Sequence, residues 1–167
     1  MNIQISPVID TDVDAIAALA KVVWQDTYPQ IISQAQIDFM LAQRYNAPRL
    51  LEELGVPGVC WEKAIVDGQL AAFASTLPGA KPGEMKLDKL YVDPDRQRLG
   101  IGGRLIDHVV KRARSQGCHA LTLAVNKRNV RAIAAYKTRG FVVREAVRLD
   151  IGNDFVMDDF IMVRSLL

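Results

Sequence analysis

The chain has few of the residues that build disulfide frameworks or metal sites. Only two of its 167 residues are cysteine, Cys60 and Cys118, and only two are histidine. The cysteines lie far apart without metal-ligand spacing, which predicts buried thiols in a reducing compartment rather than a disulfide. Neither His108 nor His119 has a neighbour in the sequence suited to share a metal ion. We therefore expect no metal cofactor.

Long apolar runs and a strong charge of either sign are also missing. No run approaches the ~20 apolar residues that span a membrane. Residues 1–5 have neither the basic nor the apolar segment of a secretion signal. The 21 basic and 19 acidic residues leave a formal net charge of +2, too small to indicate nucleic-acid binding. We expect a cytoplasmic protein without nucleic-acid or membrane partners, and a homodimer is left open.

What is present is the patterning of one α/β domain over residues 1–167. Period-2 runs predict strands, and 3.6-period runs with caps predict helices. Ser33-Gln34-Ala35-Gln36 is a capping-box sequence at the start of one such helix. A first helix, capped at Asp10 or Thr11, is expected to lose its apolar pattern around 24–29. Asp67-Gly68 predicts a two-residue hairpin turn, and Gly152-Asn153 predicts the tip of a last hairpin. The strands are expected at 3–8, 59–66, 70–77, 85–92, 120–125, from 141 and at 155–163, and the other helices at 34–45, 48–54, 100–116 and 129–139. This order predicts a mixed sheet with helices on both faces.

The most informative segment is a strand ending at Asp93-Pro94, followed by the loop Gln97-Arg98-Leu99-Gly100-Ile101-Gly102 and an amphipathic helix. Free backbone N–H groups at a helix start, beside glycines that let a ligand approach, form a phosphate-binding site. The Q-x-x-G-x-G spacing is neither a Walker loop nor a dinucleotide fingerprint. The alternative interpretation is a glycine-rich turn before a well-capped helix.

A second motif runs from Asn126 to Phe141. On a helix, Asn129, Ala132 and Tyr136 share one face. This face presents an amide, a methyl group that permits close approach, and a phenol. Such a strip can follow an extended, amide-rich ligand such as pantetheine. The alternative is that it is only the core face of a helix.

The loop and the second motif, with one strand between them, resemble the acyl-CoA-binding segments of the GNAT superfamily of N-acetyltransferases. The order of elements resembles that fold along nearly the full length, and the pattern is most similar to small bacterial amine and polyamine acetyltransferases. The resemblance implies a central sheet with splayed central strands and acetyl-CoA as co-substrate. The residues that it implies for acetyl-CoA binding are Leu90, Tyr91, Val92, Gln97, Arg98, Leu99, Gly100, Ile101, Gly102, Gly103, Arg104, Asn126, Asn129, Ala132 and Tyr136.

The resemblance also implies direct acetyl transfer without a covalent enzyme intermediate. Backbone N–H groups near Leu90–Val92 would hold the developing oxyanion, and Tyr136 would donate to the departing thiolate. The reference pKa values are ~8.5 for a thiol and ~10 for tyrosine, so full proton transfer is uphill by about 2 kcal/mol. We therefore assign Tyr136 first as a hydrogen-bond donor to the sulfur.

Asp88 is the candidate base. It lies in an otherwise apolar strand, where partial desolvation would raise its pKa and suit it to accept a proton near neutral pH. Similar polyamine acetyltransferases carry a glutamate here that acts through a water, and the shorter aspartate also favours a water relay. The alternative is a solvated or lysine-paired carboxylate. Lys89 should point to the opposite face of the strand and so should not be the partner.

The acceptor site rests on Trp24 and Tyr28, at the expected break after the first helix. Aromatic faces with nearby acids (Asp26, and Asp154 or Asp158) favour a cationic amine. We expect a small-molecule acceptor, with polyamines and other small primary amines first and a peptide or protein amino group second. The rival functions are a non-catalytic acyl-CoA sensor and an interaction module whose loop binds another phosphate.

Overall fold

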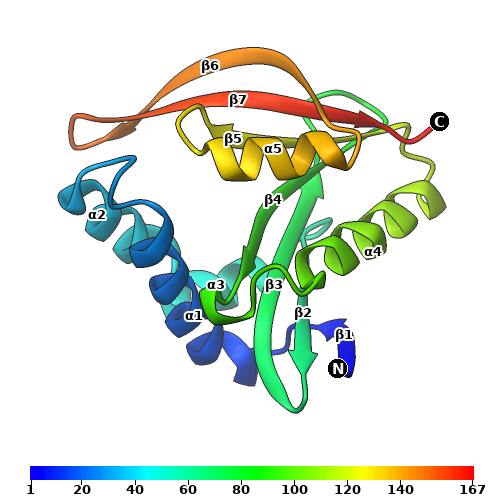
Figure 1. The fold of residues 1–167 in the computed structure, drawn as a ribbon, viewed down its shortest axis with the longest axis horizontal. Helices are drawn as coiled ribbons and strands as arrows, with labels where there is room; N and C mark the ends of the chain where they lie inside the picture. The colour runs from blue at the N-terminus through cyan, green and yellow to red at the C-terminus, as the bar shows by residue number, and fades with distance from the viewer. The chain divides into compact units, whose positions relative to one another are not determined.

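The computed structural model describes residues Met1–Leu167, and hydrogen bonds join its seven strands in the order β1-β2-β3-β4-β5-β7-β6 (Figure 1). The predicted α/β fold with a mixed sheet flanked by helices is confirmed. The chain groups into two compact units: residues 1–77 with 89–109, and residues 78–88 with 110–167. Strand β4 (Glu84–Val92) and helix α4 (Ile101–Ser115) each contribute residues to both. No helix is long and apolar enough to cross a membrane.

The first unit is built around the hairpin of β2 (Cys60–Val66) and β3 (Gln69–Pro78), and β1 (Ile3–Pro7) pairs antiparallel with β2. Asp67 and Gly68 turn the hairpin with φ values of 49° and 83°. These positive values are those of the tight turn that matches the twist of the strands. The expected hairpin turn is confirmed.

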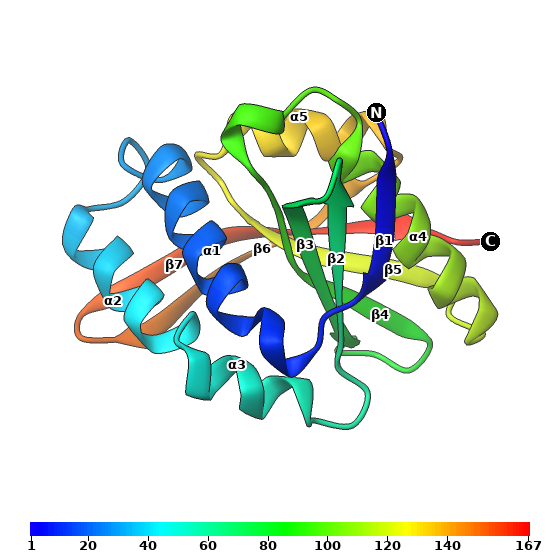
Figure 2. The same ribbon diagram turned by 90° about the horizontal axis from the view of Figure 1, so that it is seen from below.

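Helices α1 (Val13–Thr27), α2 (Gln34–Arg44) and α3 (Ala47–Leu54) follow β1 along the chain (Figure 2). A short 3₁₀ turn, Asp10–Asp12, precedes α1. The Ser33 hydroxyl accepts a hydrogen bond from the Gln36 amide at 3.1 Å and caps α2, as the sequence predicts. The expected break around 24–29 is present, because α1 ends at Thr27; Trp24 lies inside the helix, and Tyr28 follows it. Trp24 lies four residues after Ala20 and is buried with it, so it extends the apolar face of the helix.

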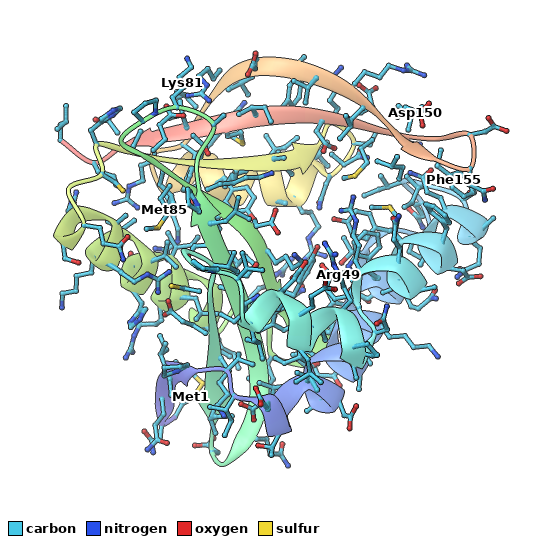
Figure 3. The ribbon with its side chains drawn as sticks, turned by 180° about the vertical axis from the view of Figure 1, so that it is seen from behind. Met1, Arg49, Lys81, Met85, Asp150 and Phe155 are labelled. Atoms are coloured by element: carbon cyan, nitrogen blue, oxygen red, sulfur yellow. The ribbon has the colours of Figure 1, made fainter.

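In the second unit β5 (Ala120–Asn126) pairs antiparallel with β7 (Phe155–Ser165), and β7 pairs with β6 (Val142–Gly152). Strand β5 also runs parallel to the start of β4, but only over Glu84–Lys86. This short pairing is consistent with strands that splay apart. The tip of the β6–β7 hairpin lies at Asn153-Asp154, with φ of 55° and 62°, one residue later than expected. Figure 3 shows the hairpin between the labels Asp150 and Phe155.

Helix α5 (Val130–Thr138) lies between β5 and β6 in the sequence. It differs from α1 because none of its residues is fully buried, and Val130 is 69% exposed. Its half-buried positions include Ala132, Ile133 and Tyr136. The face predicted from the spacing is therefore only partly buried, unlike the face of a core helix.

Candidate functional site

The loop between β4 and α4 has the backbone that a ligand-binding turn needs. Asp93 begins a 3₁₀ turn, Pro94–Arg96, and its carboxylate accepts from the Asp95 amide at 3.0 Å. Arg98 and Gly100 then have φ of 65° and 81°. This left-handed backbone lets the chain reverse into α4, whose first turn leaves N–H groups without partners inside the helix.

Space beside the loop is open where a ligand would approach. A side chain added at Gly100 would meet nothing within 4 Å, and one at Gly102 would touch only the Val92 methyl group, at 3.4 Å. Gln97 donates from Nε2 to the Val92 carbonyl at 3.4 Å and ties the loop to the end of β4. The side chain of Ile101 is buried, so only its backbone can serve a ligand. These features fit a site for a pyrophosphate group.

The β5–α5 turn places both predicted asparagines at the start of α5. The Asn129 side chain accepts from the Ala132 amide at 3.3 Å and caps the helix, while the Asn126 side chain accepts from the Arg128 amide at 2.9 Å. Both amide oxygens therefore shape the turn. Asn126 and Asn129, which the family resemblance implies as acetyl-CoA-binding residues, therefore also hold the β5–α5 turn in place.

Tyr136 lies on the half-buried face of α5, and its ring meets the ring of Phe141 edge-on at a centroid distance of 5.6 Å. Burial raises the pKa of the Tyr136 hydroxyl from its usual 10.0 to about 12. Below pH ~10 the group stays protonated, so it is suited to donate a hydrogen bond.

Asp88 has Lys86 as a partner, with Nζ 3.6 Å from the carboxylate. The two residues are two positions apart and so share a face of β4. Lys89 is the next residue of β4, and its ammonium contacts Trp61 and Glu53. The lysine-paired carboxylate that the sequence left open is present, and about a quarter of the Asp88 side chain remains exposed.

Trp24 and Tyr28 belong to a larger group of rings in the first unit, which we call the aromatic cluster: Trp24, Tyr28, Tyr45, Trp61, Phe73 and Tyr91. The rings of Trp24 and Tyr28 are 4.4 Å apart, and Tyr91 lies 6.4 Å from Trp24 and 5.4 Å from Phe73. Phe73 stacks on Trp61 at 5.8 Å. The cluster thus connects α1 with one face of the sheet.

A lysine of the protein, Lys89, lies against the aromatic cluster where the sequence predicts a cationic acceptor. Its ammonium group is 5.1 Å from the Trp61 ring centroid and 6.0 Å from that of Tyr45. It also lies 3.6 Å from a Glu53 oxygen. Arg49 on α3, labelled in Figure 3, pairs with the same carboxylate at 3.3 Å. The carboxylate that reaches the cluster is therefore already paired with two cations.

The C-terminal acids differ in environment. Asp158 is half exposed and lies 2.7 Å from the Lys127 ammonium, whose hydrogen bond lowers the pKa of the Asp158 carboxyl. Asp159 is buried, next to Asn126 in the β5–β7 register. Asp154 lies in the exposed turn at the hairpin tip. Asp159 is therefore the one of the two β7 neighbours Asp158 and Asp159 that faces inward.

The structure thus brings Trp24 and Tyr28 together and gathers the loop residues at the start of α4. Sequence reasoning missed Tyr45, Trp61, Glu53 and the role of Lys89. The hairpin turn alone would pair Trp61 with Ala74. A β-bulge at Ala64/Ile65 shifts the register by one residue and places Trp61 opposite Ser75, on the face that also holds Phe73. No group of three or more metal-ligating side chains is present.

Comparison with known proteins gives a consistent result. A family model described as "Acetyltransferase (GNAT) family" matches residues 17–141. An uncharacterized N-acetyltransferase of Mycobacterium tuberculosis (strain H37Rv) is 27% identical over 157 residues, covering 94% of this chain and 99% of the relative. The [ribosomal protein bS18]-alanine N-acetyltransferase of Escherichia coli K12 is 39% identical over 75 residues, covering 45% of this chain and 49% of that protein. The crystal structure of the PaiA N-acetyltransferase from Thermoplasma acidophilum in complex with coenzyme A has a similar fold, with a TM-score of 0.86, 24% identity and 99% coverage of both chains.

Proposed function

The chain belongs to the acetyltransferase (GNAT) family, and we propose that it transfers an acetyl group from acetyl-CoA to a primary amine by direct transfer. The observation that carries the proposal is the loop before α4. Its backbone turns through positive φ at Arg98 and Gly100, and Gly100 leaves open space beside the free N–H groups of the helix. A pyrophosphate group fits this arrangement through backbone hydrogen bonds and the helix dipole. The proposal includes acetyl-CoA binding by the residues that the family resemblance implies.

The proposed step forms one bond and breaks one. The amine nitrogen attacks the thioester carbonyl, and the carbon–sulfur bond then breaks. Backbone N–H groups near Leu90–Val92 stabilise the negative charge that develops on the carbonyl oxygen. Tyr136 donates a hydrogen bond to the departing sulfur. Asp88 takes the amine proton through a water, and Lys86 sets the charge around that carboxylate.

A base is needed because an alkyl amine with a pKa of ~10.4 is almost entirely protonated at neutral pH. Only about one molecule in a thousand is then nucleophilic. The rate should therefore rise with pH as the amine loses its proton. If Asp88 removes the amine proton, the rate of the enzyme should rise at a lower pH than the pKa of the free amine would give.

We rank a small primary amine first as the acceptor, a class that includes polyamines and free amino acids. The aromatic cluster supports a small acceptor, because aromatic rings pack against the aliphatic carbons of an amine. A peptide or protein α-amino group is the second candidate. The observation that favours it is the local similarity to an alanine N-acetyltransferase, which spans less than half of this chain.

A thiol-release assay tests the proposal. Free CoA should appear from acetyl-CoA only when an amine is present, in a panel of putrescine, spermidine, amino acids, aminoglycosides and short peptides. CoA that stabilises the protein in a thermal-shift assay without turnover on any amine would identify an acyl-CoA sensor instead. The absence of stabilisation by CoA would refute both and favour an interaction module.

A further inference from the structure

Three buried hydrogen-bond donors in the first unit have no acceptor in the structure. They are the indole Nε1 of Trp24, the indole Nε1 of Trp61 and the hydroxyl of Ser75. The three residues are only 3%, 4% and 2% exposed. Because a buried polar group without a partner costs free energy, such groups are rare in native proteins.

The three donors belong to one region of the molecule. Trp24 and Trp61 are both members of the aromatic cluster. Ser75 is directly opposite Trp61 in the β2–β3 hairpin, so both side chains are on the same face of the sheet. The Lys89 ammonium, 5.1 Å from the Trp61 ring and paired with Glu53 at 3.6 Å, lies in the same region. The three unpaired groups named above are all hydrogen-bond donors.

The chemistry of these groups selects among acceptor amines. Indole nitrogen can only donate, and a protonated polyamine also has only donors. A polyamine therefore cannot satisfy the two indoles. A carboxylate or carbonyl oxygen accepts hydrogen bonds and suits both the indoles and the nearby ammonium group.

Resting on the proposed acetyl transfer, we infer that the aromatic cluster is an acceptor subsite for an amine whose own molecule carries a carboxylate or carbonyl oxygen. Free amino acids and peptide N-termini share this chemistry. The oxygen accepts from Trp24, Trp61 or Ser75, and the rings enclose the adjacent carbon atoms. The subsite disfavours polyamines, which lack such an oxygen.

The chain offers a direct readout, because Trp24 and Trp61 are its only tryptophans. A ¹⁵N–¹H correlation spectrum of the protein saturated with CoA, which cannot turn over, should show two indole N–H signals. The ligands added are alanine, alaninamide and Ala-Gly-Gly, with putrescine and propylamine as matched amines without oxygen. We expect at least one indole proton to move downfield with the oxygen-bearing amines only.

Each outcome has a defined meaning. A shift with alanine alone identifies an amino acid as the source of the oxygen, and a shift with Ala-Gly-Gly alone identifies a peptide. No shift with any oxygen-bearing amine, or the same shift with putrescine, overturns the subsite. Acetyl transfer to putrescine but to no oxygen-bearing amine also overturns the subsite, yet it leaves the proposed function intact. Transfer to no amine at all refutes the proposed function, while the spectra still decide the subsite.

A pair of variants separates binding from folding. Ser75→Ala removes a hydroxyl without a partner, so its Tm should stay the same or rise, while the KM for an oxygen-bearing amine rises about fivefold to tenfold. The matched control is Thr122→Val in the second unit, where the buried hydroxyl donates to the Met85 carbonyl at 3.4 Å. This variant should lower Tm and leave the KM unchanged. A lower Tm with an unchanged KM in Ser75→Ala would show that the hydroxyl serves the fold, and would refute its role.

Discussion

The Tyr136 hydroxyl offers the sharpest test of the proposed chemistry. Its pKa is raised by burial to about 12, and a free thiol has a pKa of ~8.5. Full proton transfer from Tyr136 to the thiolate is therefore uphill by roughly 5 kcal/mol, more than the ~2 kcal/mol that reference values give. Tyr136 should act as a hydrogen-bond donor that keeps its proton.

The expected cost of losing this donor follows from that role. A hydrogen bond to a charged group contributes about 1.5–3 kcal/mol, which corresponds to a rate loss of roughly 10-fold to 150-fold. Tyr136→Phe should lower kcat within this range and leave the KM for acetyl-CoA nearly unchanged. The ring contact with Phe141 is kept in this variant, so its packing is little changed.

Steady-state kinetics from pH 6 to 10 with the best amine provide the assay. Because burial raises the Tyr136 pKa to about 12, its hydroxyl stays protonated throughout the range below pH ~10. The wild type and Tyr136→Phe should therefore have pH profiles of the same shape below pH ~10, differing only in height. A kcat within about twofold of the wild type would show that Tyr136 is a packing residue. An alkaline break below pH 10 that disappears in Tyr136→Phe would show that it transfers its proton.

Three further predictions concern the remaining site residues. Gly102→Val should abolish thermal stabilisation by CoA in a protein that still folds, because the side chain would cover the N–H groups of the loop; an unchanged CoA affinity would reject the pyrophosphate assignment. Asp88→Asn should lower kcat by ~10²-fold or more, as expected for a lost base, whereas Lys86→Met should mainly shift the pH profile of kcat. If Asp88→Asn is as active as the wild type, the role of Asp88 is limited to its ion pair with Lys86. Asn129→Ala removes the cap of α5 and should cost ~1 kcal/mol of unfolding free energy in a denaturant titration, and a change within error would mean that the side chain does not cap the helix in solution.

Local features of the fold were predictable because they depend on residues close in the sequence. The hairpin at Asp67-Gly68 and the cap at Ser33 each need only a few neighbouring residues, and both are present as expected. The loop at 97–102 was recognisable for the same reason. The break around 24–29 was predictable too, and α1 ends at Thr27. The sequence did not show that Trp24 still belongs to the buried face of the helix, because that depends on tertiary packing.

The charges around the site depend on tertiary contacts, and here the sequence was less informative. Alternation along the strand correctly separated Asp88 from Lys89, but it could not show that Lys86 is the partner of Asp88. Glu53 reaches Lys89 from α3, 36 positions earlier in the chain, and no local pattern links the two. The expectation of a cationic acceptor was based on aromatic residues and nearby acids in the sequence. It did not include Lys89, whose ammonium group already contacts the Trp61 ring of the aromatic cluster in the folded protein.

The three unpaired donors of the aromatic cluster also depend on tertiary contacts and could not be predicted from the sequence. Ser75 follows Ala71, Ala72, Phe73 and Ala74 and is indistinguishable there from another small core residue. Its importance comes from the register that places it opposite Trp61, and from burial that removes both groups from water. In water a tryptophan or serine always finds a hydrogen-bond acceptor, so an unsatisfied donor exists only in the folded protein. In the proposed subsite, acceptor specificity would therefore depend on side chains that residue type alone assigns to the core.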